Sequence, residues 1–172
     1  FSLSAQNCLS LKLCAKLINV TTAVLYYTFW AIAYTQWSQT CDFLLGMVVS
    51  GRNTVPMNVC ETTGLFMETL PLHIQINLKQ TCLELVRDIA YQIAQVQEHP
   101  LVELSRILSY HKIPKISQTM VIQNYPTDYL NDPGCGIQLF LLSSRYALTA
   151  PLTISIREKA DTGTLLVAFS YH

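Results

Sequence analysis

Residues 61–77, ETTGLFMETLPLHIQIN, are decisive for the fold because a dense corner leads directly into an alternating segment. The alternation places four apolar residues on one side of a predicted strand: Leu70, Leu72, Ile74 and Ile76. In the corner itself we expect Gly64 to permit a close backbone approach and Phe66 to anchor the chain in the core. Pro71 is expected to fix the start of the strand.

Two helices and a strand are predicted before this corner. The first is a short amphipathic helix over residues 9–18, ended by Asn19, with Lys12 and Lys16 off its apolar side. That apolar side consists of Leu9, Leu13, Cys14 and Leu17. A longer apolar helix, capped by Thr21 or Thr22, is expected to reach about residue 38. The run DFLLGMVVS then predicts a strand buried on both faces, and GRNTVPMN predicts a loop.

After the corner, the pattern changes to helical spacing and then back to strands. Thr81 and Glu84 form a capping-box pattern before a helix that Pro100 ends. The apolar positions of that helix are Leu85, Val86, Ile89, Ile93 and Val96. A shorter helix is predicted at 101–110, and strands are predicted at 118–125, 137–143, 151–159 and 164–172. Helices and strands mixed around one sheet indicate an α/β layered fold.

The composition excludes several functional classes. The chain has 172 residues, the size of one domain, with 11 basic and 11 acidic residues and no basic run, so a nucleic-acid partner is not expected. Hydrophobic residues make up 51% and charged residues 13%, which indicates a surface hidden against a partner or a membrane. Residues 17–41 carry no formal charge, but Thr, Gln and Tyr are spread through them and no positive flank follows. A core helix is therefore expected there, and no membrane span.

No catalytic or metal-binding set is visible in the residues alone. The six cysteines are scattered without a CxxC pattern, which is typical of reduced cytosolic thiols and argues against zinc and a disulfide scaffold. None of the four histidines lies beside another or in a ligand pair. His73 is expected to point away from the apolar side of its strand. No GxSxG, Walker or GxGxxG pattern occurs.

Six segments, in order along the chain, resemble the condensation domains of non-ribosomal peptide synthetases in their second half. The run from TTAVLYYTFW to SGRN resembles the family's buried helix and the strand that ends in Ser-Gly-Arg. TTGLFMETLPLHI resembles its Gly-x-Phe-x-Asn-Thr-x-Pro motif, and EHPLVELSRIL its His-x-Pro-Leu segment. MVIQNYP, RYALTAPLTISI and LLVAFSYH resemble its later strands. The resemblance implies a chloramphenicol-acetyltransferase-like α/β sandwich, of which this chain is one lobe.

The resemblance also implies a reaction. In the family, two phosphopantetheine-tethered substrates meet in a tunnel between two lobes, and the amine of one attacks the thioester of the other. The phosphopantetheine belongs to carrier proteins, so no cofactor is expected on this chain. The family's two adjacent histidines with a downstream Asp-Gly are absent from the sequence. No catalytic residue is therefore assigned, and whether the chain is an enzyme by itself stays open.

The absent histidine pair leaves two interpretations of the whole chain: an excised carboxy-terminal subdomain of a larger synthetase, or a complete but degenerate protein. We expect residues 1–172 to be the carboxy-terminal subdomain of a cytoplasmic synthetase, without its amino-terminal lobe and final helix, and inactive alone. Its expected partners are that lobe, carrier proteins and a second copy through the exposed lobe interface. Residues 137–143 are expected to be a crossover strand that is disordered or pairs with a neighbouring molecule. The alternatives are an epimerisation or ester-forming domain, or a non-catalytic docking module.

The resemblance assigns seven residues to the wall of the substrate tunnel. These are Ser50, Gly51, Arg52, Gly64, Phe66, Glu68 and Thr69. Glu68 departs from the motif, because the family usually has Asn at this position. Its carboxylate is expected either beside the substrates or paired as a surface acid, with Arg52 as one possible partner.

Overall fold

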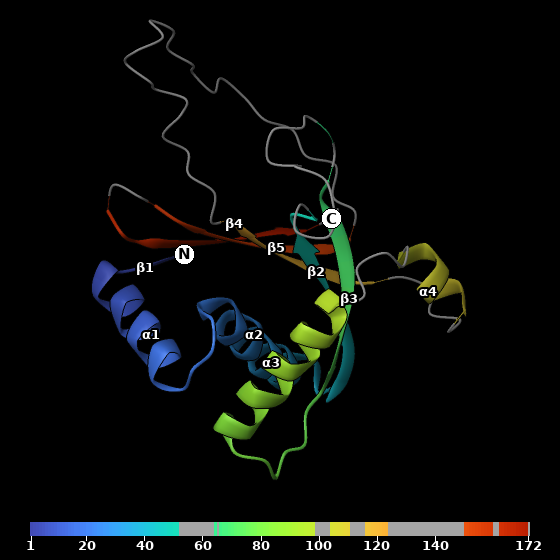
Figure 1. Ribbon diagram of the computed structural model, residues 1–172, viewed down its shortest axis with the longest axis horizontal. Coiled ribbons are helices and arrows are strands. Elements are labelled where there is room, and N and C mark those ends of the chain that lie inside the picture. The colour runs from blue at the N-terminus through green and yellow to red at the C-terminus, as the bar shows by residue number, and fades with distance from the viewer. Residues whose placement is uncertain are drawn as a thin grey trace, which may run out of the picture.

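A six-stranded sheet forms the centre of the molecule, with strand order β1-β6-β5-β4-β2-β3 (Figure 1). The computed structural model describes residues 1–51, 64, 66–98, 104–110, 116–123, 150–159 and 162–171. The strands are β1 (Ser2–Leu3), β2 (Asp42–Val49), β3 (Glu68–Gln75), β4 (Gln118–Gln123), β5 (Leu152–Glu158) and β6 (Leu165–Tyr171). The helices are α1 (Ala5–Leu17), α2 (Thr22–Ser38), α3 (Cys82–Glu98) and α4 (Leu104–Tyr110).

The sheet is mixed in strand direction, which confirms the predicted α/β class. β2 and β3 are antiparallel, β4 runs parallel to both β2 and β5, and β5 and β6 are antiparallel. β1, which pairs antiparallel with β6, is too short for its sequence to show a period and was not predicted.

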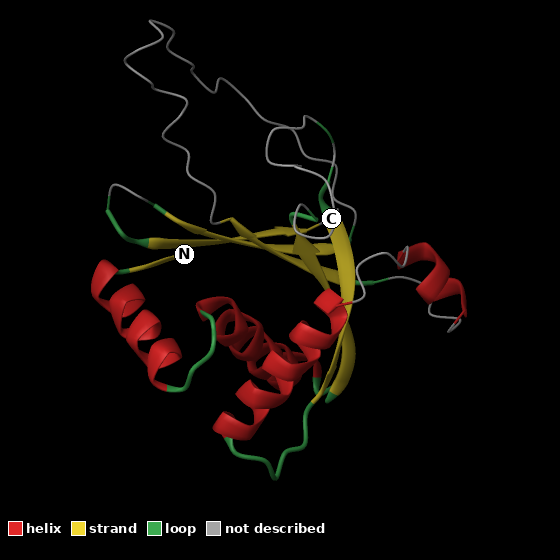
Figure 2. Ribbon diagram, in the orientation of Figure 1, coloured by secondary structure: helices red, strands yellow, loops and turns green. Residues whose placement is uncertain are grey.

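Three helices, α1, α2 and α3, lie against one face of the sheet, and α4 stands apart at its side (Figure 2). The core lies between this helical layer and the sheet. Its fully buried side chains include Leu45, Met47, Leu72, Ile74, Ile89, Met120 and Ile154. Leu70, Leu72 and Ile74 all face this core, as the alternation of residues 70–76 predicts. The strict period of two in the sequence therefore fixes which face of β3 is buried.

α2 is the central helix of the layer. The side chain of Thr21 accepts a hydrogen bond from the N–H of Val24 and caps the helix, as predicted. Indole Nε1 of Trp30 donates to Oε1 of the buried Gln118 in β4 at 2.8 Å, which joins the helix to the sheet. In the described part of the chain no single helix is long and apolar enough to cross a membrane, and α1 and α2 reach that length only as a pair bent by 104°.

α1 corrects the expected orientation of the first helix. Leu9, Leu13 and Leu17 are exposed by 52%, 54% and 86%, whereas the buried side chains are those of Cys8 and Ala15. The sequence carries both sets at helical spacing, so periodicity alone could not choose between them. The small side chains of the second set allow the helix to pack closely, which places the leucines outside.

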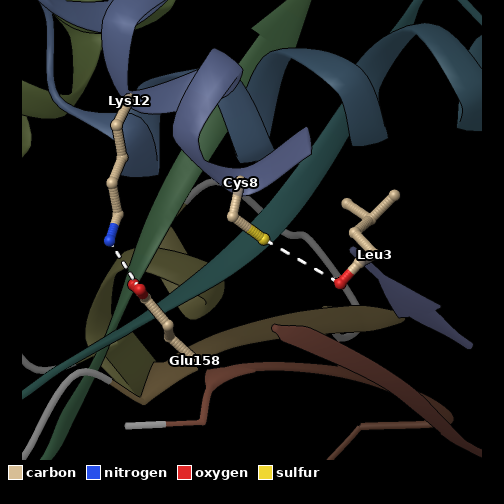
Figure 3. Close-up of polar contacts among 4 residues, drawn as sticks. All are labelled: Leu3, Cys8, Lys12 and Glu158. Carbon is tan, nitrogen blue, oxygen red and sulfur yellow. Dashed lines mark hydrogen bonds and ion pairs between the residues drawn. The ribbon is translucent and has the colours of Figure 1, made fainter. Parts of the chain in front are cut away.

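Polar contacts hold α1 to the strands around it (Figure 3). Nζ of Lys12 lies 2.5 Å from Oε1 of Glu158, the last residue of β5. Sγ of Cys8 lies 4.0 Å from the carbonyl oxygen of Leu3, consistent with a weak hydrogen bond. Burial raises the pKa of the neighbouring Tyr26 hydroxyl above its ordinary value, and the electrostatic effect of Glu158 acts in the same direction.

The capping box of α3 is confirmed. The backbone N–H of Thr81 donates to Oε2 of Glu84 at 2.7 Å, and the N–H of Glu84 donates to Oγ1 of Thr81 at 3.3 Å. The hydrogen bonds from the Thr81 backbone and hydroxyl lower the pKa of the Glu84 carboxyl. Leu85, Val86 and Ile89 are buried beneath this helix, as their spacing predicts.

Several predicted features lie outside the described residues. They are the loop after Gly51, the helix stop at Pro100, the turn-rich connection 126–136 and the crossover strand 137–143. The structure therefore does not test them.

Candidate functional site

The predicted tunnel residues gather where β2 ends and β3 begins. In the antiparallel ladder Val49 lies opposite Glu68, and Val48 lies opposite Thr69. Ser50 and Gly51 follow β2 directly, and Phe66 lies two residues before β3. The structure thus brings the described members of the predicted set to one corner of the sheet. Arg52 lies outside the described residues.

Gly51 makes the closest backbone approach in this corner. Its φ of 62° is in the left-handed region, and a Cβ at this position would lie 1.9 Å from the carbonyl oxygen of Phe66. A Cβ at Gly64, which is exposed, would instead meet the ring of Phe66 at 3.0 Å. Among the described residues Gly51 therefore lets two backbone segments meet, whereas Gly64 lies against the side chain of Phe66.

One further expectation needs correction because the strand begins earlier than predicted. β3 spans Glu68–Gln75, so Pro71 lies within the strand and does not mark its start. Proline is tolerated there because β3 is the edge strand, where its missing N–H can face away from β2. Phe66 is half-buried, which makes it a partial anchor for the corner.

Glu68 and Thr69 point to opposite faces of the sheet. Glu68 is in register with Val49, which packs against the helix-side core, and successive side chains of a strand alternate. Thr69 lies on the other face, where its Cγ2 would be 2.9 Å from a Cβ at Gly46. Glu68 is half-buried, and in the described part of the chain no ion pair reaches its carboxylate.

Sequence reasoning missed a close packing of threonines on the sheet face opposite α1, α2 and α3. A Cβ at Gly46 in β2 would lie 2.7 Å from Cγ2 of Thr119 in β4 and 2.9 Å from Cγ2 of Thr69 in β3. The hydroxyl of Thr119 in turn lies 3.1 Å from that of Thr153 in β5. The signal was available, because a glycine inside an apolar strand often marks a close approach.

A second polar group lies at the opposite end of the same two strands. Nε2 of His73 lies 2.6 Å from Oδ1 of Asp42, and the Gln75 amide donates to Oδ2 of Asp42 at 3.0 Å. The hydrogen bonds from Gln75 and His73 lower the pKa of the Asp42 carboxyl. His73 therefore faces away from the core, as predicted, and the structure shows the partner that the sequence did not.

The Gly51 corner and the His73–Asp42 pair, at opposite ends of β2 and β3, are too far apart to act on the same substrate bond. Glu68 and His73 are five residues apart, so about 17 Å of strand separates them at 3.4 Å per residue. No group of three or more potential metal ligands occurs among the described residues. The corner at Gly51 provides a close backbone approach, a carboxylate and backbone polar groups. Among the described residues it contains no nucleophile paired with a base.

The comparisons with known proteins identify the family. The family model described as "Condensation domain" matches residues 1–172. Chondramide synthase cmdD of Chondromyces crocatus is 28% identical over 158 residues, which cover 90% of this chain and 4% of the synthase. Gramicidin S synthase 2 of Brevibacillus brevis is 34% identical over 110 residues, which cover 63% of this chain and 2% of that protein.

The fold is that of solved condensation domains. The first condensation domain of the CDA synthetase superposes with a TM-score of 0.76 at 16% identity, covering 100% of this chain and 39% of that one. This chain therefore spans 4% and 2% of the length of these two synthetases and 39% of that solved domain. The mixed sheet with its helical layer is the expected chloramphenicol-acetyltransferase-like α/β fold. Because the family model matches all 172 residues, the chain belongs to the condensation-domain family, and its fold agrees with that of solved members.

Proposed function

We propose that this chain is the carboxy-terminal lobe of a domain that forms amide bonds between carrier-protein-bound thioesters in non-ribosomal peptide synthesis. The observation that carries the proposal is that the family model matches residues 1–172, while the chain covers 39% of a solved condensation domain. A segment that belongs wholly to the family and is much shorter than one domain suits a single lobe. Epimerisation and ester formation are alternatives for the same fold, without a structural feature in their favour.

In this proposal the lobe positions substrates and does not transfer protons. Amide formation needs the acceptor amine close to the thioester carbonyl, and holding two reactants in place lowers the barrier substantially. The chain has no pair of adjacent histidines, and its described His73–Asp42 pair lies about 17 Å along the strand from the Gly51 corner. The proton acceptor would then come from the other lobe, and this chain alone would be inactive.

The proposed tunnel wall is the corner at the ends of β2 and β3. The residues assigned to it remain Ser50, Gly51, Arg52, Gly64, Phe66, Glu68 and Thr69. Because Glu68 and Thr69 lie on opposite faces of the sheet, only one of them can face a tunnel that runs along a single face. Glu68 can contact a substrate in the tunnel only at the end of the sheet, beside Gly51. A Cβ added to Gly51 would lie 3.7 Å from Cγ of Glu68.

The proposed partners follow from the reaction. Carrier proteins would bring both substrates on phosphopantetheine arms, and the amino-terminal lobe would close the tunnel. The chain itself would hold no cofactor. The proposed setting is the cytoplasm, and self-association is expected only where the lobe interface is uncovered.

The proposal is tested by reconstituting the domain. The chain is assayed alone and joined to the amino-terminal lobe encoded with it, using two loaded carrier proteins and mass spectrometry of the tethered product. Amide product is expected only from the joined form, and substitution of its histidine pair should abolish that product. Product from the chain alone would refute the assignment, and carrier binding without product in the joined form would indicate a docking module instead.

Glu68 provides a second, residue-specific test in the joined form. Glu68→Asn restores the usual family residue and Glu68→Gln removes only the charge, while Asp88→Asn, on the exposed side of α3, is the matched control. If Glu68 contacts substrate, both Glu68 variants change kcat/KM for acceptors that carry a second positive charge, and the control does not. Equal activity in all three variants would place Glu68 outside the tunnel.

A further inference from the structure

The methyl group of Thr69 packs over a glycine of the neighbouring strand. Thr69 lies on the sheet face opposite α1, α2 and α3, because Leu70 beside it faces the helix-side core (Figure 2). β2 runs between β3 and β4, so Gly46 of β2 has Thr69 on one side and Thr119 on the other. A Cβ at Gly46 would lie 2.9 Å from Cγ2 of Thr69 and 2.7 Å from Cγ2 of Thr119. The two methyl groups therefore occupy the space that a larger residue would need.

This packing leaves the hydroxyl of Thr69 unpaired. The methyl and hydroxyl groups are carried by the same Cβ, and with the methyl group turned toward Gly46 the hydroxyl lies farther from it. In the described part of the chain no hydrogen bond reaches this hydroxyl, and Thr69 is only half-buried. The hydroxyls of Thr119 and Thr153 on the same face, by contrast, lie 3.1 Å apart and form a hydrogen bond. Thr69 therefore presents an unused donor and acceptor.

The unpaired hydroxyl belongs to the Gly51 corner. Thr69 lies opposite Val48, which precedes Gly51 by three residues. On the helix side of this corner Val49 and Leu70 pack into the core, so a substrate has no passage along that face. A substrate that reaches the corner over the opposite face comes to Thr69, whose hydroxyl can both donate to a carbonyl and accept from an amide.

We propose that the Thr69 hydroxyl forms a hydrogen bond with an amide or carbonyl group of the carrier-bound substrate, and that Gly46 positions this hydroxyl. The inference rests on the proposed function and assigns the polar contact of the tunnel wall to Thr69, on the face opposite the helices. Gly46 does not touch the substrate. It acts by leaving room for the methyl group of Thr69, which fixes the direction of the hydroxyl.

The surroundings of the two threonines decide which of them a larger residue at position 46 would move. Thr119 is 4% exposed, lies in an inner strand and is tied to Thr153 through its hydroxyl. Thr69 is half-buried in the edge strand β3, and no hydrogen bond holds its side chain among the described residues. A methyl group added at Gly46 is therefore expected to displace Thr69 and to redirect its hydroxyl.

The test measures kcat/KM of the domain joined to its amino-terminal lobe, with two loaded carrier proteins. Thr69→Val keeps the size and branching of the side chain and removes only the hydroxyl. Gly46→Ala displaces that hydroxyl, and the double variant shows whether the two changes act through the same group. Thr153→Val is the matched control, because it removes a hydroxyl from the same face whose partner is within the sheet. Circular dichroism shows which variants are folded.

We expect Thr69→Val to lower kcat/KM about five- to tenfold, the loss of one hydrogen bond to the substrate. Gly46→Ala should lower it as well, and the double variant should lose no more than Thr69→Val alone. The control should keep its activity. Losses that multiply in the double variant would refute the positioning role of Gly46, since a merely structural effect is independent of the hydroxyl.

The role of Thr69 can fail separately from the proposed function. Amide formation with unchanged kcat/KM in Thr69→Val would overturn this inference and leave the function standing. Absence of amide product from the unsubstituted joined domain would overturn both. Because Thr69→Val is nearly isosteric, it decides the role of the hydroxyl even if Gly46→Ala does not fold.

Discussion

Replacing Gly51 by alanine tests the corner that defines the candidate site. A non-glycine residue in the left-handed region, where Gly51 has φ of 62°, costs about 1–2 kcal/mol. The new Cβ would also lie 1.9 Å from the carbonyl oxygen of Phe66, a backbone atom that cannot rotate away. Displacing that segment adds about 1–3 kcal/mol, as overpacking does elsewhere. We expect Gly51→Ala to lower the free energy of unfolding by about 2–5 kcal/mol in all.

Gly163 supplies the matched control for this prediction. It has nearly the same φ, 61°, but among the described residues a Cβ there would meet only the Cβ of Ala5, at an ordinary 3.7 Å. Gly163→Ala should therefore cost only the backbone term of about 1–2 kcal/mol. Urea unfolding followed by circular dichroism gives both values under the same conditions. If Gly51→Ala is no more destabilising than Gly163→Ala, the close approach of Gly51 to Phe66 is refuted.

Three further predictions concern the sheet and α3. Gly46→Ala should cost about 1–3 kcal/mol in urea unfolding, because its Cβ would lie 2.7 Å from Cγ2 of Thr119. Thr119→Ser, which removes that methyl group and keeps the hydroxyl, should reduce this cost, and purely additive effects would contradict the contact. The pKa of Asp42 is lowered chiefly by Gln75, so its contribution to stability is complete above the ordinary carboxyl pKa and is lost as pH falls through the lowered value. Asp42→Asn should remove the part of the pH dependence of unfolding at acid pH that comes from Asp42. An unchanged pH dependence would contradict a stabilising role of the Asp42 hydrogen bonds. Thr81→Ala should lower the unfolding free energy by about 1 kcal/mol and Thr81→Ser by much less, whereas equal losses would exclude the hydroxyl as the cap.

Most secondary structure could be predicted because the sequence periods are strong. The alternation at Leu70, Leu72 and Ile74 specifies a strand and its buried face, since a shift by one residue would expose all three. The Thr81–Glu84 pair specifies where α3 begins through hydrogen bonds within four residues. Such features depend on neighbours along the chain, so they can be recognised without a partner element.

The clustering of the candidate residues could be predicted, and their geometry only in part. The resemblance to condensation domains placed Gly51, Phe66 and Glu68 in one corner, and the β2–β3 register brings them there. The position where β3 begins determines which glycine permits the close approach. It also determines that Glu68 and Thr69 face opposite sides of the sheet. That boundary depends on pairing with β2, which no local pattern reveals.

The sequence by itself determined the α/β class, the helix caps and the buried face of β3, because each is a local pattern of period or hydrogen bonding. Tertiary structure alone decided which side of α1 is buried, since Cys8 and Ala15 compete with Leu9 and Leu13 at equivalent helical spacing. It also decided the contact of Gly46 with Thr119 and the pairing of β1 with β6. These contacts join residues far apart in the chain, and their formation depends on packing that only the assembled sheet provides.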